Sequence, residues 1–142
     1  MRRLGLDVGD VRIGVALSDE TETLATGLPT LTRVGPRKDV RAVVALVRDR
    51  EAGEVVVGLP RSLDGSLGPQ AQKVLAFVDS LRASLRVPVT TWDERLTTVA
   101  AERTLREAGA GARERKASVD RVAAVLILQN YLDARAAQKP GA

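Results

Sequence analysis

Acidic side chains at three separated places in the chain carry its clearest chemical signal. Asp7 interrupts the apolar stretch LGLDVG, where an unpaired carboxylate would be costly to bury. Asp93 and Glu94 follow a strand-like run, and open α/β sheets place ligands at the ends of their strands. Asp120 lies on the apolar stripe of the last predicted helix. Such acids together form a ligand set suited to Mg²⁺ or Mn²⁺, which prefer oxygen.

Asp7 has a structural alternative, in which its side chain faces solvent or bonds to the following turn. Alternate residues of a strand share a face, so Asp7 lies with Gly5 and Gly9. Two glycines beside a carboxylate would leave an open trough that a ligand could enter. The cost of burying a carboxylate favours the functional interpretation.

The other acids also have structural alternatives. Asp93 and Glu94 could form a charged turn, and alternation cannot be trusted at the end of a strand, so the residues alone do not choose between them. Asp120 in a first helical turn, after a Ser118 cap, would stabilise the helix dipole. That role does not explain why Asp120 lies at helical spacing from Ala124 and Leu128, among the apolar residues of the stripe.

The chain contains no Cys and no His, which narrows its chemistry sharply. Disulfides, thiolate metal sites, Ser-His and Cys-His nucleophile pairs and most zinc catalysis are excluded. Carboxylates, cations, hydroxyl groups and hard metal ions remain. Two such ions ~3.5–4 Å apart would activate a water and stabilise the leaving oxygen of an in-line displacement.

Basic residues near these acids suggest a polyanionic partner. The formal net charge is +4, and basic proteins attract phosphate backbones. Arginine suits bidentate phosphate contacts, although such runs are more often solvated surface charge. The candidate substrate-binding residues are Arg12, Arg95, Arg113, Arg115, Lys116 and Arg121. The loop PRSLDGSLG at 60–68 could also hold a phosphate through its backbone N–H groups, but it has no Walker pattern.

Hydrophobic periodicity predicts the elements that position these residues. Strands are expected at 2–8, 12–17, 25–32, 54–59 and 87–92. Helices are expected from Pro36 to a stop at Gly53, from Pro69 onward, over 97–108 with Gly109 as the stop, and from Ser118 to about 136. Three antiparallel strands followed by βαβ crossovers predict an α/β fold, a mixed sheet with helices on both faces.

A single domain over 1–137 is expected, followed by a flexible tail at 138–142. No apolar run approaches the ~20 residues of a membrane span, and the first residues do not form a signal peptide. We therefore expect a cytoplasmic protein that does not bind membranes.

Four segments resemble the YqgF/RuvX family, the bacterial group of RuvC-like Holliday junction resolvases and pre-16S rRNA nucleases. They are LGLDVGDVRIGVALSD, VVVGLPRSLDGSLGPQAQKVLAFVDSL, WDERLTT and KASVDRVAAVLILQNYL, and they span about residues 4–132. The resemblance implies a ribonuclease-H-like fold with a five-stranded mixed sheet, and metal-dependent cleavage of phosphodiester bonds. The family's acids correspond to Asp7, Glu94 and Asp120, and its basic site residues to Arg95 and Lys116. Glu94 is preferred over Asp93 by this resemblance only.

The leading hypothesis is a nuclease for structured RNA, processing the 5′ end of pre-16S rRNA with Mg²⁺ or Mn²⁺. A resolvase of branched DNA would use the same chemistry, and a homodimer would suit cleavage of two strands by symmetry. A non-catalytic RNA-binding or ribosome-assembly module is a different class. An actin-like ATP-binding domain is another, because D-x-G before a hairpin also opens that fold, but such proteins need two domains around the nucleotide.

Overall fold

The computed structural model describes residues 1–96 and 113–138, with side chains described up to 96 and from 122. The helix expected over 97–108, its stop at Gly109 and the last residues of the expected tail lie outside these ranges. The division into a single domain and a tail therefore stays a prediction.

The first three strands form an antiparallel half-sheet, and the last two extend it in parallel. The elements are β1 (Arg2–Val8), β2 (Arg12–Ser18), β3 (Ala25–Thr32), β4 (Ala52–Leu59) and β5 (Val89–Asp93). Their order is β3-β2-β1-β4-β5, with β4 parallel to both β1 and β5. The predicted five-stranded mixed sheet is confirmed. β3 is an edge strand, which explains how it tolerates Pro29.

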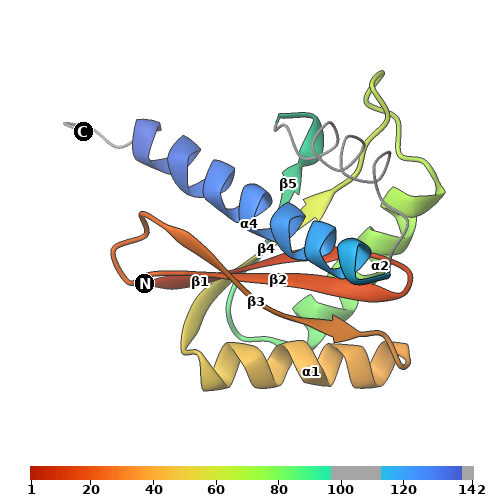
Figure 1. Cartoon of the computed structure of the whole chain (residues 1–142), viewed down its shortest axis with the longest axis horizontal. Coiled ribbons are helices and arrows are strands. Elements are labelled where there is room, and N and C mark those ends of the chain that lie inside the picture. Colours follow the sequence, from red (N-terminus) through yellow and green to blue (C-terminus); the bar gives the residue numbers. More distant parts are fainter. Residues whose placement is uncertain (97–112, 139–142) are drawn as a thin grey trace.

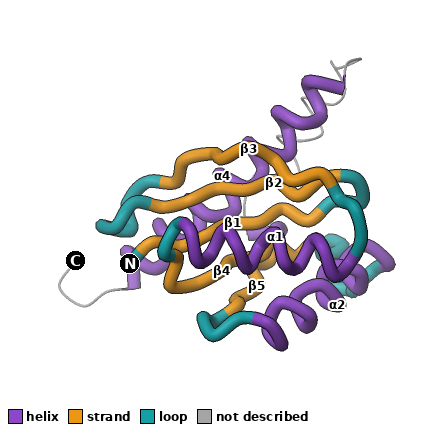
Figure 2. The backbone as a smooth tube through the Cα atoms, turned by 90° about the horizontal axis from the view of Figure 1, so that it is seen from below, coloured by secondary structure: helices purple, strands orange, loops and turns teal. Residues whose placement is uncertain are grey.

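Helices cover both faces of this sheet. Helices α1 (Pro36–Asp49) and α2 (Pro69–Ser84) pack on one face, and α4 (Arg113–Gln138) crosses the other (Figures 1 and 2). A short 3₁₀ turn, η1 (Glu94–Leu96), follows β5 directly. No helix within 1–96 and 113–138 has the length and apolarity that crossing a membrane requires.

The apolar run in β4 lies between the two helical layers. Val55 and Val57 belong to the core beneath α1 and α2, whereas Val56 belongs to the core beneath α4. All three are fully buried, which is the environment of a central strand in a sheet covered on both faces. Alternation along each strand therefore assigns every residue to one face or the other.

Two predicted helix boundaries are wrong. α1 ends at Asp49 rather than at Gly53, because Glu51 adopts a left-handed backbone, with φ of 55°, and turns the chain into β4. Gly53 then lies inside that strand. α4 begins at Arg113, so Ser118 is not its cap. The residues from 113 to 117 are good helix formers with no breaker among them, and the helix extends through them.

Candidate active site

Asp7 lies near the end of β1, on the face of the sheet that α4 covers. Leu4, Leu6 and Val8 point into the core beneath α1 and α2, so Asp7 points the other way. Its residue is only 6% exposed, although it carries a carboxylate. The structure therefore removes the solvent-facing alternative for Asp7.

The glycines that share a face with Asp7 do not form a trough for a ligand. A Cβ atom on Gly5 would lie 2.8 Å from Cβ of Leu128 and 3.3 Å from the carbonyl oxygen of Ala124. Gly5 therefore admits the backbone of α4. A Cβ on Gly9 would lie 2.9 Å from the carbonyl oxygen of Arg12, across the β1–β2 turn. The predicted trough is wrong because helix and hairpin backbone fill the space that the glycines leave.

Glu94 and Asp93 separate onto different sides of the sheet. Val89 belongs to the core beneath α1 and α2, whereas Trp92 packs against the core beneath α4. Alternation within β5 thus puts Asp93 with Val89. Glu94 follows the strand and is 7% exposed, and its Cγ lies 3.4 Å from the position of a Cβ on Gly58, on the face beneath α4. Asp93 is held by Arg95, whose Nη2 lies 2.7 Å from Oδ2. This hydrogen bond lowers the pKa of Asp93 and keeps it an ion-pair partner.

Gly58 leaves room for the Glu94 side chain on the strand between β5 and β1. Leu6 pairs with Val57 in the parallel ladder, so Asp7 lies one residue further on, beside Gly58. A Cβ on Gly58 would meet Cδ1 of Ile127 and would lie 3.4 Å from Cγ of Glu94. Backbones two strands apart are separated by roughly 10 Å, and the bare Gly58 gives Glu94 room to span part of that gap.

The direction of α4 brings its N-terminal half toward the same end of the sheet. Ala124 and Leu128 lie against Gly5, and the Tyr131 hydroxyl donates to Glu54 at the start of β4. The helix therefore runs antiparallel to β1, as Figure 1 shows. Position 120 lies about 6 Å before Ala124 along the helix axis. Asp7 lies nearly the same distance beyond Gly5 along β1, and both offsets point the same way because the helix and the strand are antiparallel.

The helix-dipole alternative for Asp120 does not hold. Because α4 begins at Arg113, Asp120 is in its third turn, and the dipole effect falls off within the first. The spacing argument remains, since position 120 continues the stripe of Ala123, Ala124, Ile127 and Leu128, all buried against the sheet. The side chain of Asp120 lies outside the described residues.

A hard divalent cation fits the donors that the described part of the site offers. Asp7 and Glu94 are both buried carboxylates on the α4 face, and the chain has no His or Cys to favour a softer metal. Across 1–96 and 122–138, no three acidic, His or Cys side chains group together as a metal site. The predicted third ligand, Asp120, lies outside these ranges.

Of the six predicted substrate-binding cations, the structure describes the side chains of two, Arg12 and Arg95. Arg12 begins β2 on the α4 face, two residues before Gly14, which pairs with Asp7. Arg95 forms an ion pair with Asp93. Its Nη1 also donates to the carbonyl oxygen of Leu63 at 3.4 Å, and this hydrogen bond connects the loop 60–68 to η1. The remaining predicted cations lie on α4, with side chains outside the described residues: Arg113, Arg115, Lys116 and Arg121.

A buried polar network that we did not predict fixes α4 on the sheet. Glu54 accepts hydrogen bonds from Arg3 at 2.6 Å, from the Thr90 hydroxyl at 2.6 Å and from the Tyr131 hydroxyl at 2.9 Å. Arg3 also forms an ion pair with Glu22. The available signal was Glu54 at the start of an apolar strand and Tyr131 on an apolar helical stripe, two polar groups that need partners when buried.

Comparison with known proteins agrees with this architecture. The model of the RuvX family, described as Holliday junction resolvase, matches residues 1–134. A relative from Thermoanaerobacter pseudethanolicus is 49% identical over 136 residues, covering 95% of this chain and 98% of that protein. One from Moorella thermoacetica is 53% identical over 133 residues, covering 94% and 95%. Both bear the name "Putative pre-16S rRNA nuclease".

Solved structures show the same fold at low sequence identity. RuvC of T. thermophilus in complex with a Holliday junction substrate aligns with a TM-score of 0.61 and 16% identity, covering 97% of each chain. The fowlpox virus Holliday junction resolvase aligns with a TM-score of 0.53 and 13% identity, covering 95% of this chain and 99% of that one. The fold is that of the RuvC-like nucleases, which is ribonuclease-H-like. With a family model that matches nearly the whole sequence and relatives that share about half of its residues, this chain belongs to the RuvX family of Holliday junction resolvases.

Proposed function

We propose that this chain is a divalent-metal-dependent nuclease that processes the 5′ end of a 16S rRNA precursor, with Asp7, Glu94 and Asp120 as its metal-binding catalytic residues. Its family makes it an enzyme that hydrolyses nucleic acid. The finer substrate comes from the names of relatives that share about half of its residues. The observation that carries the site is the pair of buried carboxylates, Asp7 and Glu94, on the two sides of Gly58.

The proposed site divides its work among three elements. Asp7 is held by the paired strand β1, Glu94 by the 3₁₀ turn after β5, and Asp120 by α4, which close packing at Gly5 fixes against the sheet. Bound Mg²⁺ or Mn²⁺ would supply an activated water and neutralise charge on the phosphate. Arg12 and the cations on α4 are suited to hold the flanking phosphates.

The test compares near-isosteric variants of the three acids. Asp7→Asn, Glu94→Gln and Asp120→Asn each remove one anionic ligand at almost constant volume. Supporting residues around metal sites alone contribute about 10–100-fold in activity, so loss of a direct ligand should lower cleavage by more than about 100-fold. Asp79→Asn, which removes an exposed carboxylate from α2, is the matched control and should cleave normally.

The assay uses a 5′-extended 16S rRNA fragment with Mg²⁺, Mn²⁺ or chelator, and circular dichroism verifies that each variant is folded. Wild-type rates in a folded Asp7, Glu94 or Asp120 variant would remove that residue from the mechanism. Cleavage that persists in chelator would remove the metal.

A second substrate follows from the family description, which is that of a Holliday junction resolvase. The same acids would hydrolyse branched DNA by the same chemistry. A four-way DNA junction belongs in the same assay beside the rRNA fragment, and the ratio of kcat/KM for the two substrates decides between them. A ratio that favours the junction would reject the rRNA assignment and leave the catalytic site intact.

A further inference from the structure

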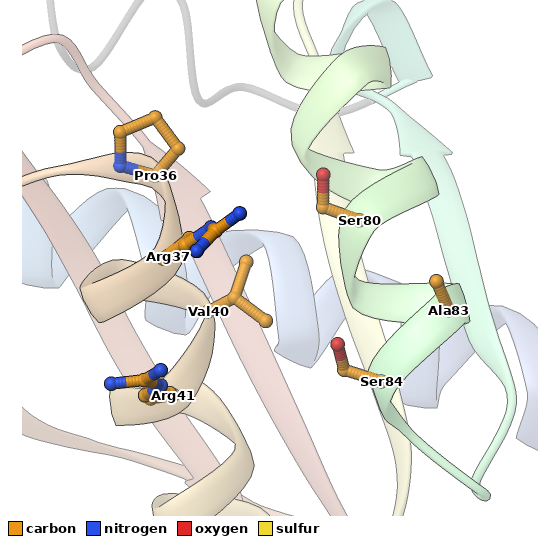
Figure 3. A pocket seen from close by; sticks show the side chains of 7 residues that line it. All are labelled: Pro36, Arg37, Val40, Arg41, Ser80, Ala83 and Ser84. Carbon is orange, nitrogen blue, oxygen red and sulfur yellow. The ribbon is translucent and has the colours of Figure 1, made fainter.

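A cationic groove lies between α1 and α2, on the face of the sheet opposite the candidate active site. It encloses about 420 Å³ and is shown in Figure 3. Its lining residues are Pro36, Arg37, Val40, Arg41, Ser80, Ala83 and Ser84. None of them belongs to the candidate active site, and no step of the proposed reaction uses them.

The α1 wall of this groove carries two arginines without a counter-charge. Arg37 and Arg41 are one helical turn apart, about 6 Å along the axis, and both are exposed. Within the described residues neither forms an ion pair, and no acidic residue lines the groove. Asp39, the acid nearest in sequence, is buried and held by Arg33 at 2.8 Å. The groove therefore presents a local positive charge.

The α2 wall supplies hydroxyl groups opposite these guanidinium groups. Figure 3 shows Ser80 and Ser84 on α2 facing the space into which Arg37 and Val40 extend from α1. The Ser80 hydroxyl donates to the carbonyl oxygen of Ala76 at 3.2 Å, and its oxygen can still accept or share a hydrogen bond. Guanidinium groups on one wall and small hydroxyls on the other suit an anion with several oxygens.

The groove adjoins a second hollow near the end of the sheet that carries Asp7. This hollow of about 340 Å³ shares Pro36 with the groove and extends to Asp10 and Lys73. Lys73 Nζ lies 3.4 Å from Oδ1 of Asp10, three residues after Asp7. A path from this end of the sheet to Arg37 and Arg41 would follow the second hollow, which Arg33 and Lys73 line together with the acids Asp10 and Asp39.

We propose that this groove binds the phosphodiester backbone of the substrate at a distance from the cleaved bond, with Arg37 and Arg41 as the phosphate-binding residues. The inference rests on the proposed function, because it takes the occupant to be the nucleic acid that the enzyme cuts. The groove is then a second binding surface for the substrate, on the face of the sheet opposite the candidate active site. Contacts of this kind position a nucleic acid without reading its sequence.

The first test measures binding in an Asp7→Asn background, so that the nucleic acid stays intact. Arg37→Ala/Arg41→Ala should raise Kd several-fold for a 5′-extended rRNA fragment, measured by fluorescence anisotropy. Loss of two phosphate contacts should also make the plot of log K against log salt less steep by roughly 1.4 to 1.8. Lys38→Ala/Arg48→Ala is the matched control, since it removes two exposed cations from α1 outside the groove.

A second pair of variants tests the opposite wall without touching an arginine. Ser84→Glu adds a negative charge inside the groove, whereas Gln72→Glu adds one at an exposed position of α2 about three turns away, outside the groove. We expect Ser84→Glu alone to weaken binding. Equal effects of the groove variants and their controls on Kd and salt slope would overturn the proposal, since only total charge would then matter. The absence of any effect of the groove variants would also overturn it.

The last measurement separates this proposal from the proposed function. With Asp7 intact, the groove double variant should raise KM for a long precursor, while its KM for a short oligonucleotide that spans only the cleavage site should match wild type. If the wild type cuts neither substrate, the proposed function fails, while the anisotropy results still decide the groove. If KM rises equally for both lengths, the groove proposal fails and the catalytic assignment stands.

Discussion

Asp93 and Glu94 are neighbours in sequence but have opposite surroundings. Asp93 is paired with Arg95 on one side of the sheet, and Glu94 is buried beneath α4 on the other. The sequence could not separate them, because alternation fails where a strand ends, and here a 3₁₀ turn begins directly at Glu94. The resemblance to the RuvX family preferred Glu94, and the burial of Glu94 beside Gly58 agrees with that preference.

This difference predicts unequal effects of two similar substitutions. Asp93→Asn should reduce kcat for the rRNA fragment by less than about tenfold, because it changes only how firmly Arg95 and the loop 60–68 are held. Glu94→Gln should reduce kcat by more than about 100-fold, because it removes a ligand. Steady-state kinetics in Mg²⁺ measures both, and a larger loss for Asp93→Asn than for Glu94→Gln would exchange the two roles.

At the scale of elements, hydrophobic patterning predicted most of what positions the site. The all-apolar run of β4 and the prolines that open α1 and α2 lie in the predicted places. The errors concern residues whose role depends on distant partners. Gly5 looked like the floor of a trough, but the approach of α4 determines its surroundings. No local pattern contains that information.

The packing of α4 at Gly5 leads to a prediction about this helix. Gly5→Ala puts a methyl group 2.8 Å from Cβ of Leu128 and close to the backbone of Ala124, so α4 must shift. Overpacking of this kind costs about 1–3 kcal/mol, and a shift of α4 would also move Asp120. We therefore expect a lower Tm together with a loss of cleavage that persists well below the Tm.

Gly53→Ala is the matched control for this substitution. The atoms nearest to the added methyl group belong to the side chain of Met1, which is flexible and can move aside. Its Tm and cleavage rate should stay near those of wild type. Full cleavage activity in a Gly5→Ala protein of lowered Tm would show that the position of α4 does not control the site.

At the scale of the whole molecule, the network around Glu54 links the first strand, the central strand and the last helix. Burial alone would raise the pKa of Glu54, but hydrogen bonds from Thr90, Arg3 and Tyr131 and the charge of Arg3 outweigh it, so its pKa is lowered. A group with a lowered pKa in the folded state stabilises the fold above its unfolded pKa and loses that contribution as pH falls through the folded value.

Acidification should therefore weaken the protein through this carboxylate. We expect the free energy of unfolding to fall as pH drops below about 4.5, the ordinary value for a glutamate, with Glu54 contributing to the loss. Glu54→Gln should cost roughly 1–3 kcal/mol at neutral pH, since Arg3 loses this charged partner but keeps Glu22, and should flatten the acid dependence.

Urea unfolding at neutral and acidic pH measures this effect, with Asp79→Asn as the control on an exposed acid. An unchanged pH dependence in Glu54→Gln would assign the acid sensitivity to other groups. Asp39 is the next candidate. Burial would raise its pKa, but the backbone N–H of Val34 and the side chain of Arg33 bring it below the ordinary value.

The covering of the sheet on both sides has a consequence for the shape of the nucleic acid. The buried acids face α4, and the arginine groove opens between α1 and α2 on the reverse side. A polynucleotide that touches both must change direction around the end of the sheet. Smooth bending of a 20–30 bp duplex costs of order 1–6 kcal/mol, whereas a stem that ends in single strands or forks turns without that elastic cost. If both surfaces bind the substrate as proposed, the layered architecture would favour substrates that turn easily, with no contact to any base.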